Sequence, residues 1–180
     1  MSIFKYKQFL ESKKYEFGCV MVDFPVNNWN ELTNSIINTE DVYTGGDDVH
    51  GIQEYPHLTL LYPVMNNVKF QEIEKVLKGV VNEKIKIEID KIDYFENQEF
   101  DVVKFNIKKN DYLNTIHNEL KSLIPNDDKY DIYRPHITIA YVNKGSGIKY
   151  LSDYVFSFEV DKILYTESSG LKYIHKILTY

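Results

Sequence analysis

Two short stretches of the chain repeat one pattern of chemically active residues. Pro56 to Tyr62 reads Pro-His-Leu-Thr-Leu-Leu-Tyr, and Pro135 to Tyr141 reads Pro-His-Ile-Thr-Ile-Ala-Tyr. Near neutral pH, one imidazole can take a proton from an attacking hydroxyl while a second, protonated imidazole gives a proton to a leaving oxygen. Two threonine hydroxyls can donate hydrogen bonds to the oxygens of a phosphoryl group. The repeat therefore predicts one site, built from two similar halves, that could break a phosphodiester without a metal.

The four candidate catalytic side chains occupy matching positions in two expected strands. Successive side chains of a strand point to opposite faces. His57 and Thr59 therefore share one face, and His136 and Thr138 share the corresponding face of the second strand. The aliphatic residues between them point the other way and can pack under helices. If the two strands lie side by side, two imidazoles and two hydroxyls converge on one pocket.

The same alternation predicts which residues flank the catalytic pairs. Tyr55 and Leu61 fall on the face of the first pair, and Arg134 and Ala140 fall on the face of the second. Arg134 is the only arginine of the chain, and its guanidinium could hold a phosphate with two parallel hydrogen bonds. These unlike neighbours are where we expect substrate choice to be decided.

Further candidates for ligand contacts lie outside the two motifs. Phe95 follows an expected strand and could stack on a base. Lys144 lies near the end of the second motif strand and could attract phosphate. His50, in a polar loop, could belong to a lid, whereas His117 and His175 are expected to have structural places.

A metal site is the alternative chemistry for a histidine pair. No His-Glu-x-x-His pattern and no closely spaced cluster of acids accompanies the two motifs. Cys19 is the only cysteine, which rules out an intramolecular disulfide and a cysteine-based metal site. We therefore expect neither a metal nor another cofactor.

Composition and charge limit the partners. The 180 residues are enough for a single domain over 1–180 with a sizeable core. The net charge of −6 and the lack of a long basic run argue against long nucleic acid, but a small anionic ligand could still bind in a local pocket. No apolar stretch approaches the length of a membrane span, and Met1 to Leu10 does not resemble a secretory signal. We expect a cytosolic protein that does not bind membranes.

The spacing of hydrophobic residues predicts the elements that must position the site. Helices are expected over Ser2 to Lys14, about 27–38, Asn66 to Val81 and Asp111 to about 124. Strands are expected over Phe17 to Phe24, the two motifs, Lys84 to Asp90, Phe100 to Ile107, Tyr154 to Val160 with an extension over Ile163 to Tyr165, and Leu171 to Leu178. Thr39 to Tyr55 is expected to be a long loop. This order predicts an α+β fold with helices packed on sheets.

The two His-x-Thr motifs resemble the signature of the 2H phosphoesterase superfamily, which includes 2′-5′ RNA ligase-like proteins and cyclic phosphodiesterases. The resemblance covers roughly residues 16 to 180. It implies a LigT-like fold of two intertwined lobes with pseudo-twofold symmetry, antiparallel sheets forming a central cleft, and helices packed outside. It also implies that His57 and His136 share the roles of base and acid, without saying which has which, while Thr59 and Thr138 bind the phosphate.

Within that superfamily the chain looks most similar to the phage anti-CBASS nucleases of the Acb1 family. The stretches that carry this likeness are His50 to Tyr62, Tyr94 to Lys104 and Arg134 to Gly145. Pro63 departs from the pattern, which has a glycine at that place. The likeness implies cleavage of the 3′-5′ bonds of cyclic di- and trinucleotide messengers, such as cyclic GMP-AMP, in the host bacterial cytoplasm, which would end antiphage signalling. By position in the chain it also implies an acid beside the ligand, for which Glu167 is the candidate.

Two other functions remain open. The enzyme class could stay the same while the substrate is RNA that ends in a 2′,3′-cyclic phosphate or contains 2′-5′ linkages. The chain could instead be a sponge that binds cyclic nucleotides without cleaving them, although both histidines and both threonines of the repeat are present.

Overall fold

The computed structural model describes residues 16–45 and 50–177. The helix expected over Ser2 to Lys14 lies outside these residues. The strands are β1 (Gly18–Asp23), β2 (His57–Val64), β3 (Ile85–Glu96), β4 (Phe100–Ile107), β5 (His136–Asn143), β6 (Ser152–Val160), β7 (Lys162–Thr166) and β8 (Lys172–Lys176). The helices are α2 (Trp29–Ile36), α3 (Phe70–Val80) and α4 (Asp111–Leu123), with short 3-10 turns η1 (Thr39–Asp41) and η2 (Gly147–Tyr150).

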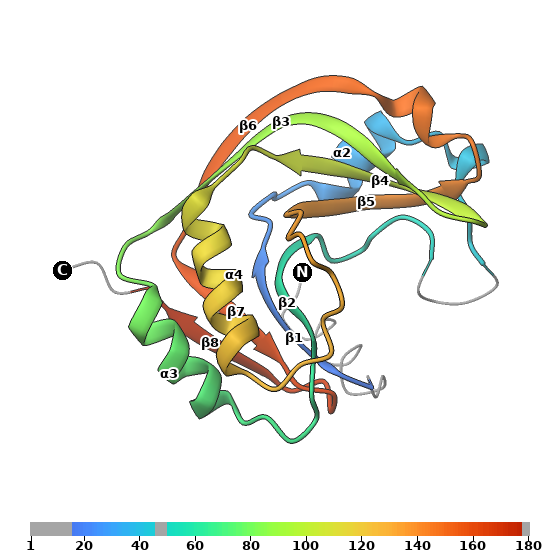
Figure 1. Ribbon diagram of the computed structural model, residues 1–180. Helices are drawn as coiled ribbons and strands as arrows, with labels where there is room; N and C mark the ends of the chain where they lie inside the picture. Colours follow the sequence, from blue (N-terminus) through green and yellow to red (C-terminus); the bar gives the residue numbers. More distant parts are fainter. Residues whose placement is uncertain (1–15, 46–49, 178–180) are drawn as a thin grey trace.

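The strands form one sheet in the order β6-β3-β4-β5-β2-β1-β7-β8, and all neighbours are antiparallel. The two motif strands, β2 and β5, lie next to each other at the centre of the sheet, so each is the innermost strand of one half. They are joined by a single residue pair, Leu58 and Ile137. The sheet is strongly curved, and β3 and β6 arch over one side of the molecule (Figure 1). This is the two-lobed antiparallel arrangement expected for the chain.

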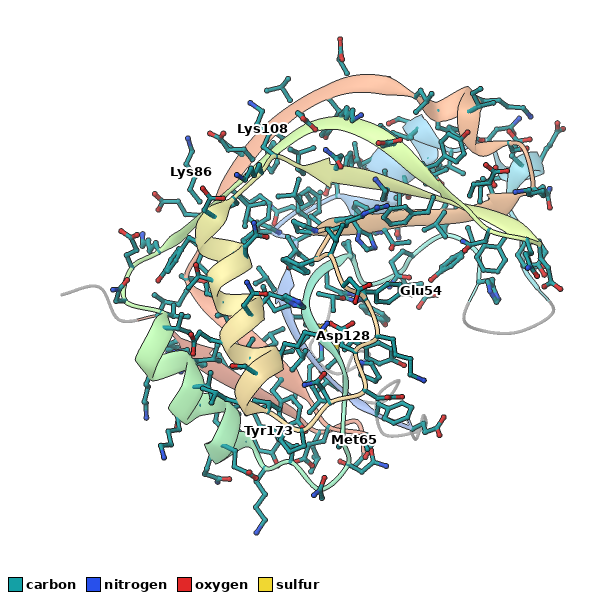
Figure 2. The ribbon with its side chains drawn as sticks, viewed as in Figure 1. Glu54, Met65, Lys86, Lys108, Asp128 and Tyr173 are labelled. Carbon is teal, nitrogen blue, oxygen red and sulfur yellow. The ribbon has the colours of Figure 1, made fainter. Side chains whose placement is uncertain are left out.

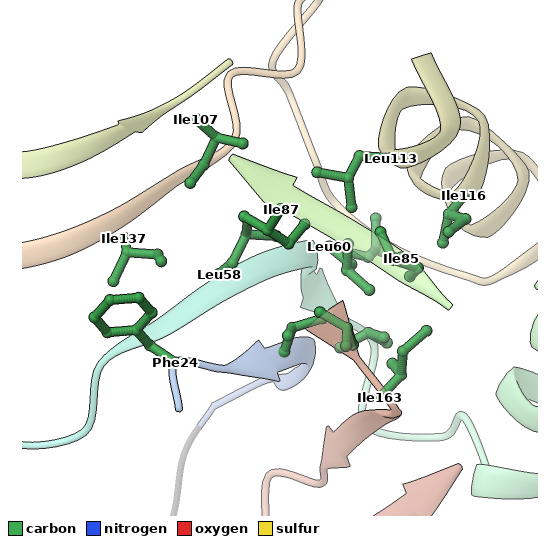
Figure 3. Packing of buried hydrophobic residues seen from close by; sticks show 14 of the residues in the cluster. Phe24, Leu58, Leu60, Ile85, Ile87, Ile107, Leu113, Ile116, Ile137 and Ile163 are labelled. Carbon is green, nitrogen blue, oxygen red and sulfur yellow. The ribbon is translucent and has the colours of Figure 1, made fainter. Parts of the chain in front are cut away.

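The hydrophobic core lies on the sheet face away from the motif histidines. Leu58, Leu60, Ile137 and Ile139 are all fully buried on that face. Helix α4 packs against β2 and α3 against β8, because each helix has one apolar side. Figure 3 shows buried side chains of the first motif strand, β2, close to side chains of α4 and of β3. The core therefore holds the backs of both motif strands and leaves their polar face to the site.

A matching irregularity interrupts the sheet pairing in both motif strands. Between β1 and β2 the register shifts after Thr59, and between β4 and β5 it shifts after Thr138. Each shift adds one residue to the motif strand, which is a β-bulge. Two bulges at equivalent places show that the two halves repeat one backbone design, as the pseudo-twofold expectation requires.

The helices and strands predicted between residues 16 and 177 are present, but some of their ends differ: β3 continues to Glu96, beyond the predicted end at Asp90, and α3 begins at Phe70, after the predicted start at Asn66. Ile163 to Tyr165 was expected to extend the strand that ends at Val160, and this is wrong. It belongs to the separate strand β7, which pairs with β1 and β8, whereas β6 pairs with β3 on the opposite edge. Only Asp161 and Lys162 separate the two apolar segments, and no turn signal such as glycine or proline marks the point at which the chain passes from β6 to β7.

The segment expected to be a long loop contains ordered structure on both sides of residues 46–49. It begins with the 3-10 turn η1 and forms isolated bridges from Val42 to Val142 and from Ile52 to Ala140. Backbone hydrogen bonds to Ile139 and Tyr141 of β5 secure it. The segment thus covers the part of β5 that β2 does not reach.

Candidate active site

The single pair that joins β2 to β5 fixes the geometry of the site. Leu58 and Ile137 are antiparallel partners, so one step further on either side places His57 opposite Thr138 and Thr59 opposite His136. Each histidine therefore faces the threonine of the other motif. The two imidazoles come from diagonal positions, whose Cβ atoms lie roughly 7–8 Å apart. That gap is wide enough for a phosphoryl group between them.

The imidazoles of both motif histidines make the same kind of hydrogen bond. His57 Nδ1 donates to the carbonyl oxygen of Tyr55 at 2.9 Å, and His136 Nδ1 donates to that of Arg134 at 2.8 Å. A carbonyl oxygen can only accept, so Nδ1 must carry the proton in both rings. Each Nε2 is then left to take or give a proton according to the charge of its ring. This arrangement fits both rings for acid–base work.

A buried lysine lies beside the second motif. Lys104, on β4, is the cross-strand partner of Thr138 and is only 3% exposed. Its Nζ sits 4.4 Å from the centre of the Phe95 ring and 3.8 Å from the Asp93 carboxylate. Burial lowers the pKa of Lys104, while the charge of Asp93 opposes that effect. Lys104 was missed because nothing in the sequence says that Phe100 to Ile107 pairs with the second motif strand.

Phe95, a candidate to stack on a base, lies beside the second motif histidine. Its ring meets the His136 ring edge to face, with 4.9 Å between the ring centres. Tyr94, the neighbouring residue, points to the other sheet face, because Tyr94 pairs with the buried Val103. Phe95 therefore both packs against a catalytic ring and remains available as an aromatic surface beside it.

The first motif has different neighbours. Asp23 of β1 is the cross-strand partner of His57, and Met21 is that of Thr59. Burial raises the pKa of Asp23, while the positive charges of Lys162 and His57 oppose that effect. Cys19, also on β1, lies within hydrogen-bond reach of Thr59, and burial raises the pKa of its thiol to about 12. Cys19 is therefore a neutral thiol near the site.

The surroundings of the second motif histidine, His136, favour its neutral form. Burial is the largest cause that lowers the pKa of His136, and the charges of Lys104 and His57 act in the same direction. The hydrogen bond to the Arg134 carbonyl opposes them, because it stabilises the protonated ring. His136 is therefore suited to accept a proton near neutral pH.

The bulges change which residues flank the catalytic pairs. Strict alternation placed Leu61 and Ala140 on the catalytic face, and this is wrong, since both are buried in the core. The extra residue in each motif strand turns Tyr62 and Tyr141 toward the histidine face instead. The tyrosine five residues after each histidine was visible as part of the repeat, but only the bulge explains its place.

Buried side-chain contacts hold the segment that precedes the second motif against the first motif strand, β2. The Tyr133 hydroxyl donates to the Thr59 carbonyl oxygen at 2.7 Å, and burial raises the pKa of that hydroxyl. His117 of α4 donates from Nδ1 to the Leu60 carbonyl oxygen at 2.8 Å and stacks on Tyr133 with 4.1 Å between ring centres. The buried carboxylate of Asp128, which is labelled in Figure 2, lies 3.8 Å from His117 Nε2. His117 therefore has the structural place expected for it.

Lys144 is not brought to the catalytic pairs. It follows the end of β5, about 25 Å along the strand from His136 by strand rise. There its Nζ lies 2.7 Å from Glu96 and 2.6 Å from the Asn97 carbonyl oxygen. Lys144 thus clamps the β3–β4 hairpin to the end of β5.

Glu167 and His50 also occupy other places. Glu167 closes the β7–β8 turn through its backbone, and its carboxylate accepts from Ser169 at 3.2 Å. The ring of His50 packs among Tyr43, Phe100 and Tyr141, at the covered part of β5. Tyr55 and Arg134, in contrast, adjoin the catalytic rings through their backbone carbonyls.

Within residues 16–45 and 50–177, no three histidine, cysteine, aspartate or glutamate side chains are grouped as metal ligands would be. In the same residues, no helix has the length and apolar character needed to cross a membrane.

Sequence comparison places the chain in a known group. The family described as the 2′-5′ RNA ligase superfamily matches residues 43–168, which contain both histidine motifs. Comparison with curated proteins gave no match.

Solved structures share the fold at low sequence identity. Kluyveromyces marxianus Usb1 matches with a TM-score of 0.64 and 6% identity, over 91% of this chain and 99% of that one. Escherichia coli LigT in complex with ATP matches with a TM-score of 0.62 and 15% identity, over 93% of this chain and 100% of that one. LigT in complex with 3′-AMP matches with a TM-score of 0.56 and 14% identity, over 92% and 97%. These likenesses show a common fold.

Proposed function

Because the chain belongs to the 2′-5′ RNA ligase superfamily, we propose that it is a phosphodiesterase in which His57 and His136 perform the acid–base chemistry. The observation that carries the proposal is the cross-strand register, in which each histidine faces the threonine of the other motif. The identical Nδ1 hydrogen bonds support it, because they leave both Nε2 atoms to exchange protons. Thr59 and Thr138 are the proposed donors to the phosphate.

The proposed reaction is a displacement at phosphorus. A hydroxyl, either the 2′-hydroxyl of the substrate or water, gives its proton to one imidazole Nε2 and forms a new bond to phosphorus. The bond from phosphorus to the leaving oxygen breaks, and the second imidazole protonates that oxygen. The two threonine hydroxyls donate to the non-bridging oxygens, on which negative charge is held during the displacement. All four side chains belong to this chain, and no metal or cofactor enters the scheme.

The proposed substrates are cyclic di- and trinucleotides, cleaved at 3′-5′ bonds. The likeness of the motif stretches to anti-CBASS nucleases supports this choice. Lys104 and Arg134 provide positive charge beside the second motif, in a chain whose net charge is −6. Phe95 offers a ring on which a base could stack next to His136. Cleavage in the host bacterial cytoplasm would remove the messenger of antiphage signalling.

A second candidate substrate is RNA ending in a 2′,3′-cyclic phosphate. Both the description of the matching family and the nucleotides bound in related structures favour it. Usb1 has been solved with uridine monophosphate, and LigT with 3′-AMP. The same four side chains would act, with water as the attacking hydroxyl.

A side-by-side turnover assay distinguishes these substrates. The protein is incubated with cyclic GMP-AMP, cyclic di-AMP, a cyclic trinucleotide and an RNA ending in a 2′,3′-cyclic phosphate, and products are separated by chromatography. The variant carrying both His57→Ala and His136→Ala is the control, and a parallel reaction contains a chelator. We expect linear products from the cyclic nucleotides, none with the double variant, and no effect of the chelator. Tight binding without any product would instead support a sponge, and strong inhibition by the chelator would support a metal site.

A further inference from the structure

Side chains from outside the sheet hold the backbone of β2 where it separates from β5. In the described sheet, Leu58 is the last residue of β2 with a partner in β5. The Tyr133 hydroxyl donates to the carbonyl oxygen of the next residue, Thr59, at 2.7 Å. His117 Nδ1 donates to the carbonyl oxygen of the residue after that, Leu60, at 2.8 Å. Two consecutive carbonyl groups of the first motif are therefore bound by side chains.

These two carbonyl groups belong to the β-bulge of the first motif strand. Consecutive residues of β1 pair with Thr59 and with Leu61, so Leu60 between them has no partner there. A bulge interrupts the regular ladder and leaves its extra residue unpaired. The direction in which the Thr59 side chain points therefore depends on the groups that hold the bulge from outside.

The bulge of the second motif strand is held in an equivalent way. Consecutive residues of β4 pair with Thr138 and with Ala140, so Ile139 is the extra residue. Its carbonyl oxygen accepts a hydrogen bond from the backbone N–H of Gln53 at 2.9 Å. The Trp29 indole N–H donates to the carbonyl oxygen of Gln53 and so fixes that segment in turn. A backbone donor does here what two side chains do in the first half.

Tyr133 connects one motif histidine to the threonine that it faces. It lies three residues before His136, and its hydroxyl is bound to the backbone of Thr59. His136 faces Thr59 across the two strands. The segment that carries the histidine is therefore bound directly to the threonine of the same pair. Gln53 stands in the corresponding relation to the other pair, since it lies four residues before the first motif histidine.

The Tyr133 ring is itself held in place by packed and paired groups. It stacks on His117 of α4 with 4.1 Å between the ring centres and 5° between the ring planes. The Asp128 carboxylate lies 3.8 Å from His117 Nε2 and 3.4 Å from Lys121 Nζ. Lys121 also donates to the Tyr130 carbonyl oxygen at 2.6 Å. A shift of the Tyr133 hydroxyl would require these groups to move together.

We propose that Tyr133 is a positioning residue, which sets the Thr59 hydroxyl in place opposite His136. The inference rests on the proposed phosphodiesterase function, in which Thr59 donates to the phosphate, and adds the group that places this donor. Tyr133 needs no contact with the substrate, because it acts through the backbone of Thr59. It has no such bond to Thr138, whose strand is held by the segment around Gln53.

The first test removes one hydroxyl and measures kcat and KM separately. Tyr133→Phe keeps the ring that stacks on His117 but no longer donates to Thr59. Because a small misplacement of a group that acts in the transition state is costly, we expect kcat to fall by about 10-fold or more, with KM within about 2-fold of the wild type. Steady-state kinetics on the nucleotide that the wild type cleaves measure both.

Tyr112→Phe is the matched control. The Tyr112 hydroxyl also donates to a backbone carbonyl oxygen, that of Val80 at 3.2 Å. This bond joins the start of α4 to the end of α3 and involves neither motif strand. Tyr112→Phe therefore removes a hydrogen bond of the same kind and should leave kcat unchanged.

A double-mutant cycle separates the positioning of one threonine from a general disturbance of the site. If Tyr133 acts through Thr59, adding Tyr133→Phe to Thr59→Val should lower kcat by less than about 2-fold. Adding it to Thr138→Val should lower kcat by the full factor seen in the wild type. An equal loss in both backgrounds, or wild-type kcat in Tyr133→Phe, overturns the assignment.

A second measurement needs no substrate. NMR relaxation of the threonine methyl groups reports how tightly each side chain is held, and Thr59→Val and Thr138→Val identify the two signals. In Tyr133→Phe the order parameter of the Thr59 methyl group should fall, while that of Thr138 stays the same. In Tyr112→Phe neither should change. An unchanged Thr59 signal in Tyr133→Phe, or an equal fall at both threonines, overturns the assignment.

The two claims can fail separately. A protein that cleaves no nucleotide, yet loses order only at Thr59 in Tyr133→Phe, would lose its proposed function and keep Tyr133 as the group that places Thr59. A protein that cleaves nucleotides, with the same kcat and the same Thr59 order in Tyr133→Phe as in the wild type, would keep the function and lose the inference.

Discussion

Leu58 and Ile137 are the only residue pair through which β2 and β5 are joined in the described sheet, and both side chains are fully buried. This pair anchors the backs of the two motif strands in one core. Because neighbours along a strand point to opposite faces, the pair also sets the four polar residues beside it on the other face, in two crossed histidine–threonine pairs. The backbone register at this one buried pair thus sets the geometry of the proposed catalytic groups.

We expect the two threonines to contribute to turnover more than to stability. Thr59→Val and Thr138→Val keep the shape of the side chain but remove the hydroxyl proposed to donate to the phosphate. Loss of one such donor should lower kcat by about 100-fold. Steady-state kinetics measure the effect, with Thr39→Val at the exposed start of η1 as the control. Wild-type kcat in both variants would show that the hydroxyls do not contact the phosphate in the transition state.

Phe95 should affect substrate binding. Stacking of a base on an aromatic ring contributes about 1–3 kcal/mol, so Phe95→Ala should raise KM by about 5- to 160-fold. Phe95→Leu, which keeps an apolar side chain against His136 and loses the ring, should show much of the same rise. Tyr130→Ala changes an exposed aromatic residue and serves as the control. A fall in kcat at unchanged KM would contradict stacking and indicate that Phe95 acts only by positioning His136.

Asp101 should matter for stability and not for chemistry. Its buried carboxylate accepts hydrogen bonds from the backbone N–H groups of Gly145 and Gly147, each at 2.9 Å. Asp101→Ala leaves both groups without that partner and should reduce the free energy of unfolding by about 2–4 kcal/mol. Denaturant unfolding measures this, with exposed Asp127→Ala as the control. Asp101 pairs with Val142, near the end of β5 remote from His136, so the folded variant should keep its turnover.

The pH dependence of stability should carry a contribution from His136. The pKa of His136 is lowered by burial and by the charges of Lys104 and His57. The unfolded chain therefore binds a proton at a higher pH than the folded protein, and stability falls as the pH drops below about 6.5 toward the lowered pKa. Denaturant unfolding at about pH 7.5 and about pH 5 should show a smaller loss in His136→Gln than in the wild type. An equal loss in both proteins would contradict the sign of this shift.

Much of the site could be predicted from the repeat alone. The alternation of polar and aliphatic residues correctly indicated that Leu58 and Ile137 are buried, and their pairing then sets His57 and His136 on the other face. Phe95 was predicted as a surface on which a base could stack, but its contact with His136 was not predicted, because it depends on β3 and β5 both pairing with β4. Local patterns succeeded where the relevant contact is made by the strand itself.

The remainder depended on which strands become neighbours. Lys104 and Asp23 reach the site only because β4 and β1 flank the motif strands, and no local pattern specifies such pairing. Tyr62 and Tyr141 reach the histidine face through bulges that reverse the alternation. Lys144 lies near a motif strand in sequence, but the length of that strand carries it to the opposite end.

The measurement that tests the central claim most directly compares kcat/KM of His57→Ala, His136→Ala and the double variant on the substrate cleaved by the wild type. If the two motifs form one site, the histidines act in the same step, and each single loss should reach about 100- to 10,000-fold. The kcat/KM of the double variant should then be only slightly lower than that of the less active single variant, because the effects of removing groups that act as a unit are not additive. Full activity in either single variant, or losses that multiply in the double variant, would contradict a single site built from both halves.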